Sequence, residues 1–502
     1  MSNLENMAQE YYQKGEFPLA LSAWLELAQS NPEKENYYIC AGNCFDAMGN
    51  KESAVKCYLK AYKQNKKSLP AISNLATAYY ELENLEEAKK YSCLALKYDS
   101  ENLSALINLG NVFYRQKKYN EALEYYKKAV EINEDYFVAV INLANTYFDL
   151  KDYAMSLRYA KQATKLDSNA LHAWTLLGNS ALETGDYDEA LSAFLKAEKI
   201  DSADPWIHNY LSQAYQKKSL WKNAFENGWQ AVEKSGGEES HHINFGYLLY
   251  EAKLEKQDSL CAEYVKIWQE KYGQNKIVLH MCKALSDGRS EGVAPAEYVR
   301  NIFDVFAPDF EQVLDGLEYR APDLIYRFLQ EIYGAKKYFG LRILDAGCGT
   351  GLCGKFLKKY ASFRGLIGVD LSSGMLKEAA TKKIYSELIC QDIFEYLNAE
   401  KSSYDLIVAA DVFTYIGDLE KLFSALSDSL KKRGRVIFTV SENSINDSKW
   451  FLHASGRFLH SLKYVENLLE KNGFLQEKIS REKLRNEGDS EVFGYIISAQ
   501  KK

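Results

Sequence analysis

The stretch Arg342–Gly351, RILDAGCGTG, joins a short apolar run to three closely spaced glycines. The run Leu341–Leu344 is bounded by glycine, which predicts a buried parallel strand. Gly347, Gly349 and Gly351 follow directly, and the helical pattern KFLKKY comes next. Glycines tolerate unusual backbone dihedrals and have no Cβ, so they let the backbone approach a ligand closely. We therefore predict a strand, a ligand-binding turn and a helix here.

The residues around this turn fit two classes of cofactor. Gly349, Gly351 and Gly354 satisfy the GxGxxG dinucleotide pattern, and Asp370 stands where a ribose-binding carboxylate is expected. Asp345, at the exit of the strand, would repel a pyrophosphate but suits a cofactor that brings a positively charged amino group. S-adenosylmethionine is such a cofactor. The sequence therefore favours S-adenosylmethionine, with another nucleotide-binding α/β domain as the alternative.

The stretch resembles the glycine-rich motif of class I S-adenosylmethionine-dependent methyltransferases, and later segments keep the order of that family. Four of them match its strands and loops: LIGVDLS, CQDIF, YDLIVAADVFTYIG (Tyr404–Gly417) and GRVIFTV. A terminal pair, Phe474–Ser480 and Glu491–Ala499, would supply the antiparallel edge hairpin typical of the fold. The resemblance implies a doubly wound, Rossmann-like α/β domain with seven strands over residues 341–502.

The resemblance also assigns roles to matching residues. It implies that Asp370 binds both ribose hydroxyls, that Leu371 and Met375 flank the adenine, and that Asp392 and Ile393 contact the adenine amino group and ring. The expected cofactor-binding residues are Tyr319, Arg320, Asp345, Gly347, Gly349, Gly351, Asp370, Leu371, Met375, Asp392, Ile393 and Asp411.

A closer resemblance involves Phe303–Pro322, FDVFAPDFEQVLDGLEYRAP, and Gly456–Ser461, GRFLHS. Both resemble predicted bacterial methyltransferases that carry tetratricopeptide repeats, and a small group of animal methyltransferase-like proteins. The resemblance implies that residues 296–340 form a helical lid over the cofactor, with Tyr319 and Arg320 as contacts. The aromatics Phe303, Phe306 and Phe310 form one helical stripe, so we expect them to pack between helices.

Methyl transfer from a sulfonium is an in-line displacement, so a base is needed only when the acceptor arrives protonated. The sequence Ala410-Asp411-Val412-Phe413 replaces the (Asp/Asn)-Pro-Pro-(Tyr/Phe) motif, which disfavours methylation of adenine or glutamine amides. By analogy with small-molecule methyltransferases, Asp411 and Tyr415 line the pocket. His460 is the nearest candidate for a titrating group, with a structural histidine as the alternative. The predicted catalytic residues are Asp411, Tyr415 and His460.

The first half of the chain repeats every 34 residues without a gap. Small residues recur at positions 8 and 20 of each unit, where two helices must approach closely. The units begin at Met1, Glu35, Leu69, Leu103, Phe137, Leu171 and Pro205. The pattern closely resembles the tetratricopeptide repeat, which implies an all-α solenoid of seven helical hairpins over residues 1–238.

The segment after the repeats loses their register. Residues 239–285 stay helical in pattern, and we interpret them as a degenerate capping hairpin, because the end of a stack needs a different outer face. Residues 286–295, SDGRSEGVAP, gather Gly, Ser, Asp and Pro and predict a linker. The predicted order is therefore solenoid, cap, linker, lid and methyltransferase domain.

Asparagines recur at positions 6 and 9 of the repeats, on the concave face expected for the solenoid. A side-chain amide offers a donor and an acceptor, so a ladder of amides could hold the backbone of an extended peptide. The alternative is a local structural role, because asparagine is usual at both positions in this repeat type. The ladder consists of Asn43, Asn74, Asn108, Asn111, Asn142, Asn145 and Asn179.

Composition and charge limit the kinds of partner that the protein is expected to bind. The net charge is −7, the isoelectric point is near 5.7 and no long Lys/Arg block appears, so nucleic acid is not expected to bind. No apolar run is long enough to span a bilayer, and the N-terminus has no export signal, so no membrane association is expected. Nine scattered cysteines without metal-ligand spacing favour a reducing, cytoplasmic location and predict no metal site.

Two functions fit these observations. In the first, the protein is an S-adenosylmethionine-dependent methyltransferase whose solenoid recruits a protein partner or substrate and which methylates a protein side chain. In the second, it is a small-molecule O- or N-methyltransferase whose repeats serve as a tether or a self-association module. A non-catalytic scaffold ranks last, because Asp345, the glycines of the turn and Asp370 are all present.

Overall fold

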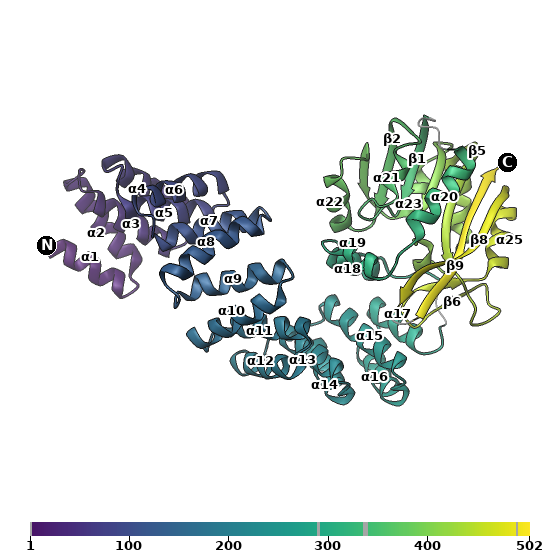
Figure 1. The fold of residues 1–502 in the computed structure, drawn as a ribbon, viewed down its shortest axis with the longest axis horizontal. Helices are drawn as coiled ribbons and strands as arrows, with labels where there is room; N and C mark the ends of the chain where they lie inside the picture. The colour runs from purple at the N-terminus through teal and green to yellow at the C-terminus, as the bar shows by residue number, and fades with distance from the viewer. Residues whose placement is uncertain (1–2, 289–291, 335–339, 488–489) are drawn as a thin grey trace. The chain divides into compact units, whose positions relative to one another are not determined.

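The computed structural model describes residues 3–288, 292–334, 340–487 and 490–502. The chain divides into two compact units, Met1–Lys218 and Ser219–Lys502 (Figure 1). The division falls inside the seventh predicted repeat. The second helix of that repeat, α14 (Trp221–Lys234), therefore belongs to the second unit.

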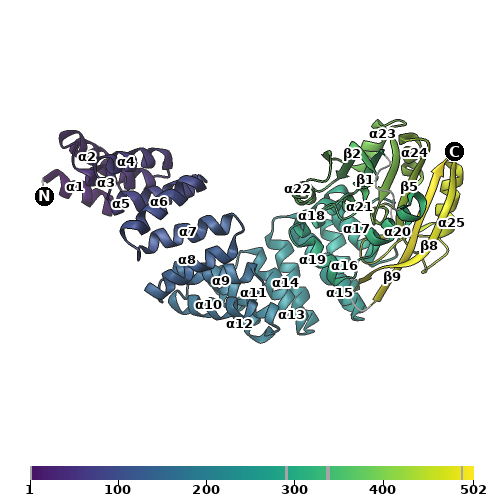
Figure 2. The ribbon, with the colours of Figure 1, turned by 45° about the horizontal axis from the view of Figure 1, so that its top comes forward.

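The first unit consists of helices that each pack against the next along the chain (Figure 2). Small residues allow the close approach: a Cβ on Gly110 would collide with the Tyr126 ring, and Gly42 and Gly178 face aromatic rings in the same way. The predicted all-α repeat solenoid is thereby confirmed. The helices are α1 (Asn3–Gln13), α2 (Phe17–Ser30), α3 (Glu35–Ala47), α4 (Lys51–Gln64), α5 (Leu69–Glu81), α6 (Leu85–Tyr98), α7 (Leu103–Arg115), α8 (Tyr119–Ile132), α9 (Phe137–Asp149), α10 (Tyr153–Leu166), α11 (Leu171–Thr184), α12 (Tyr187–Ile200) and α13 (Pro205–Lys217).

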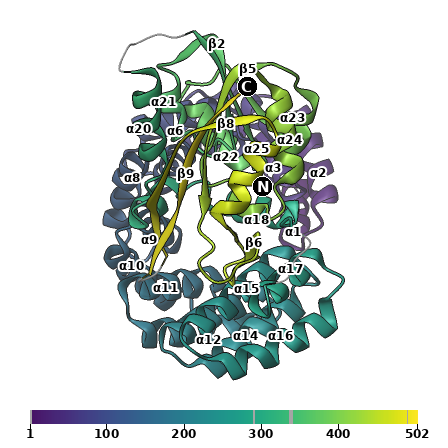
Figure 3. The ribbon, with the colours of Figure 1, turned by 90° about the vertical axis from the view of Figure 1, so that its right-hand side faces the viewer.

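Four helices open the second unit (Figure 3), and two of them, α15 and α17, contact its α/β part. Tyr250 of α15 donates its hydroxyl to Glu487 at 3.1 Å, and His280 of α17 hydrogen-bonds the carbonyl of Gly456 at 2.9 Å. The segment predicted as a capping hairpin thus contacts the sheet domain directly. After α14, these helices are α15 (Glu239–Leu254), α16 (Asp258–Tyr272) and α17 (Lys276–Leu285).

The α/β part is a seven-stranded sheet of order β3-β2-β1-β4-β5-β9-β8. Strands β1 to β5 are parallel, and β9 joins β5 antiparallel and pairs with β8 in a terminal hairpin. This topology confirms the predicted doubly wound class. The strands are β1 (Leu341–Ala346), β2 (Ala361–Asp370), β3 (Glu387–Cys390), β4 (Tyr404–Ala409), β5 (Leu430–Ser441), β8 (Phe474–Glu487) and β9 (Ser490–Lys501), with a separate pair β6 (Trp450–Leu452) and β7 (Phe458–His460).

Helices cover both faces of the sheet, because β1 and β4 are apolar and buried on both sides. On one face Leu344 and Ile407 pack among residues of α24 and α25, and on the other Ile343 and Leu406 pack against α20. The helices of this part are α18 (Ala296–Phe306), α19 (Phe310–Gly316), α20 (Ala321–Tyr333), α21 (Gly354–Leu357), α22 (Ser373–Thr381), α23 (Ile393–Ala399), η1 (Phe413–Tyr415), α24 (Glu420–Ser429) and α25 (Leu462–Lys471).

Two segments differ from the sequence expectation. In the predicted linker 286–295, the carbonyl of Gly292 accepts hydrogen bonds from the N–H groups of Gly417 and Asp418 at 2.6 and 2.9 Å, so its described part is packed on the domain; residues 289–291 lie outside the described residues. The terminal hairpin is also longer than predicted: β8 runs to Glu487, seven residues beyond Ser480. Within the described ranges, no helix has both the length and the hydrophobicity to cross a bilayer.

Candidate active site

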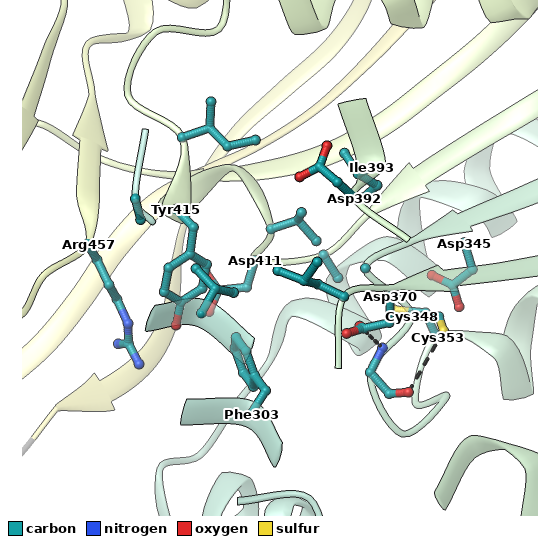
Figure 4. A pocket seen from close by; sticks show the side chains of 18 of the residues that line it. Phe303, Asp345, Cys348, Cys353, Asp370, Asp392, Ile393, Asp411, Tyr415 and Arg457 are labelled. Atoms are coloured by element: carbon teal, nitrogen blue, oxygen red, sulfur yellow. Dashed lines mark hydrogen bonds between the residues drawn. The ribbon is translucent and has the colours of Figure 1, made fainter. Parts of the chain in front are cut away.

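A cavity of about 490 Å³ lies at the carboxyl edge of β1, β2 and β4 (Figure 4). The loops that follow these strands form one wall, and helices α18 and α19 supply Val299, Phe303, Phe310 and Leu314 to another. In such sheets ligands bind where the strand order reverses, which here is between β1 and β4. The helices of the predicted lid 296–340 therefore border the expected ligand site; residues 335–339 of that range lie outside the described residues.

The glycine turn after β1 leaves backbone open to the cavity. Gly347, Gly349 and Gly351 all have positive φ, of 68°, 53° and 89°, which a residue with a Cβ rarely adopts. A Cβ on Gly347 would also collide with Val412, whereas Gly349 has only the Phe310 ring nearby, at 3.8 Å. Gly347 is therefore needed for packing, and Gly349 leaves space for a ligand.

Asp370, at the end of β2, is held in one orientation above this turn. Its Oδ2 accepts a hydrogen bond from Gly349 N at 2.8 Å, and its Oδ1 accepts one from Ser372 N at 2.9 Å. Burial raises the pKa of this carboxyl, while the backbone hydrogen bonds favour its ionised form. Each oxygen keeps a lone pair for a second donor, so the group suits two adjacent hydroxyls.

Asp345, the last-but-one residue of β1, lines the cavity from a buried position. Tyr385 donates its hydroxyl to Oδ2 at 2.6 Å. Burial raises the pKa of this carboxyl to about 7, against the lowering effect of the tyrosine. A cation bound beside Asp345 would stabilise its charged form and lower that pKa. The position thus suits the amino group that the sequence analysis assigned to it.

Asp411 follows β4 with a φ of 56°, in the left-handed region that costs a non-glycine residue about 1–3 kcal/mol. Its Oδ1 and Oδ2 accept hydrogen bonds from Arg485 Nη1 at 3.1 and 2.9 Å. Arg485 comes from β8, in the part of the hairpin that the sequence analysis did not predict as strand. Asp411 therefore lines the cavity as half of an ion pair.

Arg457 and Tyr415 line the cavity next to this pair, as Figure 4 shows. The Arg457 side chain keeps 28% of its surface exposed although it lies deep in the domain, because that surface faces the cavity. Its Nη1 lies 3.3 Å from Glu487 Oε2. The Tyr415 ring meets Phe303 edge-on at 5.5 Å. This end of the cavity combines aromatic surface with a guanidinium.

Most of the predicted cofactor residues do line this cavity. Three do not: Met375 is buried in α22, Gly351 packs towards Tyr385, and Arg320 lies outside the wall. The predicted residues that line it are Tyr319, Asp345, Gly347, Gly349, Asp370, Leu371, Asp392, Ile393, Asp411 and Tyr415.

His460 and Arg320 require correction. His460 lies outside the lining and is completely buried, where its Nε2 hydrogen-bonds the carbonyl of Ile416 at 2.8 Å. Burial lowers its pKa to about 4, so it stays neutral and holds the loop after β4 in place. Arg320 directly precedes α20, and its backbone N–H donates to the carbonyl of Leu484 at 2.9 Å; its side chain is not part of the cavity wall.

Four of the lining residues on which the site depends were not among the predicted site residues: Phe303, Phe310, Arg457 and Arg485. Phe303 and Phe310 were expected to pack between helices, yet both face the cavity. The two residues lie on different helices, α18 and α19, where their rings meet edge-on at 5.9 Å, so they pack between these helices and line the cavity as well. Arg457 lies in the stretch GRFLHS, from which only His460 was singled out. Arg485 is one of several cationic residues in β8, so nothing in the local sequence marked it.

The asparagines of the repeats bind mainly to neighbouring helices. Asn43 Oδ1 accepts hydrogen bonds from Tyr58 and Asn74, both at 2.9 Å, and the corresponding Asn111 accepts from Tyr126 at 2.6 Å and Asn142 at 3.1 Å. These contacts fit the alternative interpretation, in which the asparagines have a local structural role in the repeats.

The other three asparagines also have partners on nearby helices. Asn108 donates to Thr77 at 2.9 Å, Asn145 pairs with His172 at 3.0 Å, and Asn179 bonds the Tyr210 hydroxyl. Among the described residues, the Nδ2 of Asn43 and Asn111 and the Oδ1 of Asn74 and Asn142 have no hydrogen-bond partner. Each bonded pair thus offers one donor and one acceptor to a ligand.

Comparisons with known proteins agree with this architecture. Residues 343–434 match the family model described as a methyltransferase domain, and residues 36–68, 69–102, 104–136 and 141–205 match tetratricopeptide-repeat models. The chain carries both kinds of domain, which confirms the combination that the sequence predicted.

Two curated relatives are similar to the methyltransferase part. Malonyl-[acyl-carrier protein] O-methyltransferase of Priestia megaterium is 31% identical over 29% of this chain and 52% of the relative. Methyltransferase-like protein 27 of Homo sapiens is 30% identical over 31% of this chain and 63% of the relative. The chain thus spans about half to three-fifths of the length of these relatives. A solved structure of a putative S-adenosylmethionine-dependent methyltransferase from Listeria monocytogenes covers 34% of this chain and 97% of its own, at 18% identity and a TM-score of 0.28.

Proposed function

We propose that this protein is an S-adenosylmethionine-dependent methyltransferase whose repeats recruit a polypeptide. The observation that carries the proposal is the fixed carboxylate of Asp370, aimed over the open glycine turn. S-adenosylmethionine supplies a methyl group activated by a sulfonium. Asp370 would bind the two ribose hydroxyls, Leu371 and Ile393 would contact the adenine, and Asp345 would pair with the amino group.

The surroundings of these residues fit that role. The backbone near Gly349 is open to the cavity, so a ligand can approach it without a side chain in the way. Phe303, Phe310 and Leu314 form an apolar wall that excludes water from the reacting atoms. The free cysteines of the described chain fit the reducing cytoplasm that we propose as its location.

The affinity for S-adenosylmethionine should depend on pH through Asp345. A cationic amino group binds the ionised carboxylate, and the ionised fraction grows as the pH rises through about 7. We expect the affinity to rise roughly tenfold between about pH 6 and about pH 8 and then to level off. Calorimetric titration across this range checks it. The Asp345→Asn variant should lose this dependence, and an unchanged pH profile in that variant would contradict the assignment.

The repeat unit supports recruitment of an extended polypeptide. The bonded pairs Asn43–Asn74 and Asn111–Asn142 hold their amides in fixed orientations and leave one donor and one acceptor on each pair. The two pairs are 68 residues apart, which is two repeats, so they form a regular array. Fixed groups of this kind bind a peptide backbone without a large entropic loss.

The double variant Asn74→Ala/Asn142→Ala removes the two unpartnered carbonyls and leaves the tyrosine hydrogen bonds to Asn43 and Asn111 intact. We expect methyl incorporation into polypeptide to fall at least about tenfold, because two backbone hydrogen bonds are lost. Cofactor affinity should stay the same. The exposed pair Asn133→Ala/Asn169→Ala, in loops of the same repeats, is the control. Equal incorporation in both double variants would show that these carbonyls do not hold the substrate.

A small-molecule acceptor is the second candidate. The cavity of about 490 Å³, lined largely by apolar and aromatic groups, is its support. In this case the repeats act as a tether or in self-association.

One experiment separates the two candidates. The purified chain is incubated with S-adenosylmethionine carrying a tritiated methyl group and with a cell extract separated into macromolecular and low-mass fractions. Label in a polypeptide band, reduced by Asn74→Ala/Asn142→Ala, supports recruitment by the repeats. Label only in the low-mass fraction supports the small-molecule candidate. Transfer to neither fraction would contradict the proposed activity.

A further inference from the structure

Arg457 is the most distinctive group at the acceptor end of the cavity. It comes from the loop before β7, and its guanidinium points into the space beside Tyr415 and Phe303 (Figure 4). In the described part of the chain, the guanidinium makes one hydrogen bond, to Glu487 at 3.3 Å. Glu487 also accepts from Tyr250 at 3.1 Å and lies 3.7 Å from Arg485 Nη2. Arg457 therefore shares its only carboxylate partner and has further N–H donors for a ligand.

The charges on the cavity wall favour an anion at this position. Arg485 neutralises Asp411 through two hydrogen bonds, and Asp418 and Lys421 bring opposite charges to the same wall. Glu487, the partner of Arg457, is not part of the wall. The carboxylate that pairs with Arg457 thus lies outside the wall, which leaves the remaining guanidinium N–H groups to the cavity. A planar anion that matches the guanidinium fork would bind these groups.

Asp345 and Asp370 are assigned to the cofactor in the proposed function, and the other carboxylates of the described wall already have hydrogen-bond partners. Among the lining residues that the structure describes, Asp411 is paired with Arg485, Asp392 accepts the N–H groups of Phe394 and Glu395, and Asp418 accepts from Glu420 N and Tyr464.

The remaining titratable groups of the wall do not change this picture. Burial raises the pKa of the Tyr319 phenol and of the Cys348 and Cys353 thiols, so these groups keep their protons. His460, the predicted base, lies outside the cavity. With Asp345 and Asp370 bound to the cofactor, an acceptor that arrives protonated, such as an ammonium or an alcohol, would therefore find no unpaired base on the described wall.

We propose, on the basis of the function proposed above, that the methyl acceptor is a carboxylate held by Arg457 and Tyr415. One carboxylate oxygen attacks the methyl carbon as the bond between that carbon and sulfur breaks, and the electron pair stays on sulfur. The products are a methyl ester and a neutral thioether, and no proton moves. Arg457 binds the other carboxylate oxygen, and its charge allows the anion to enter a largely apolar cavity.

Alkaline treatment of the labelled products tests this proposal, because a methyl ester releases methanol in dilute base. N-methyl groups and methyl ethers do not. With the intact chain, tritiated S-adenosylmethionine and the fractionated extract, we expect the label to become volatile after alkali. The macromolecular fraction reports a side-chain or terminal carboxylate, and the low-mass fraction reports a free acid. Label that resists alkali would overturn the carboxylate acceptor and leave the methyltransferase function standing, whereas no transfer would overturn both.

The role of Arg457 is tested by Arg457→Gln and Arg457→Lys. We expect Arg457→Gln to raise the KM for the labelled acceptor about 10- to 100-fold, as expected for the loss of a charge-assisted hydrogen bond, and Arg457→Lys to recover part of it. Calorimetric affinity for S-adenosylmethionine should stay within about twofold.

Two further variants secure the interpretation. Arg481→Gln removes a guanidinium that binds Glu442 on the exposed side of β8, and it should leave both constants unchanged. If Arg457→Gln does not fold, Tyr415→Phe reports on the same carboxylate site and should raise the KM several-fold. An unaltered acceptor KM in the folded Arg457 variants, or in Tyr415→Phe where they do not fold, would overturn the assignment.

Discussion

Replacing Asp370 by asparagine is expected to lower the affinity for S-adenosylmethionine by at least about 100-fold. The substitution keeps the size of the side chain but removes its charge, so two charge-assisted hydrogen bonds to ribose hydroxyls are weakened together. The asparagine amide has one oxygen and one NH₂ group in place of the two carboxylate oxygens. One of the two backbone donors, Gly349 N or Ser372 N, therefore faces the NH₂ group, which cannot accept its hydrogen bond. Calorimetric titration of the purified chain measures the effect.

Asp405→Asn is the matched control. Asp405 is also an aspartate on a parallel strand of the same sheet, but it binds Arg342 N and Lys431 at the opposite edge, each at 2.8–2.9 Å. The Asp405→Asn variant should bind S-adenosylmethionine within about twofold of the affinity of the unaltered chain. If Asp370→Asn binds as tightly as the unaltered chain, Asp370 does not hold the ribose and the cofactor assignment fails.

The second large effect is expected from Arg485→Gln. The Arg485 side chain is only 4% exposed, and its removal leaves Asp411 without its cationic partner at a position of unfavourable backbone conformation. Breaking a buried ion pair from one side costs about 3–5 kcal/mol, which lowers Tm by roughly 10 °C in a domain of this size. Thermal unfolding followed by circular dichroism measures the shift.

A double variant shows whether the cost comes from the stranded charge. Arg485→Gln/Asp411→Asn has no buried unpaired carboxylate, so we expect it to regain at least about half of the lost stability. A double variant as unstable as Arg485→Gln alone would mean that Arg485 acts through packing. Arg435→Gln, which removes a more exposed arginine paired with Glu477, is the control for a general loss of charge.

The parts of the site that follow from local pattern were predictable. The strand, the turn and the helix around Gly347 share one stretch of chain, and the positive φ angles observed there are those for which glycine is selected. Asp345 and Asp370 end adjacent parallel strands, and such strands always place their ends at the same edge of the sheet. The repeat was equally predictable, since a small residue must recur wherever Gly110 and its equivalents meet an aromatic ring.

The parts that depend on distant contacts were not predictable. His460 follows a motif-like segment, but its ring points to the Ile416 carbonyl and away from the cavity. Arg485 reaches Asp411 only because β8 continues well past its predicted end. Phe303 and Phe310 share a stripe in the sequence, and only the packing of α18 and α19 decides that this stripe faces a ligand space.

The sequence by itself determined the period of the repeat and the order of the motifs that mark the strands. It also determined the glycine turn and the acidic residues Asp345 and Asp370 beside it. Each of these follows from backbone geometry within a few residues or from a strict periodicity. Only the tertiary structure decided which groups meet at the acceptor end. Arg457 and Arg485 come from separate segments and join Asp411 and Tyr415 of the loop after β4. Their meeting depends on how the long terminal hairpin and the helices α18 and α19 pack around the sheet, which no local pattern encodes.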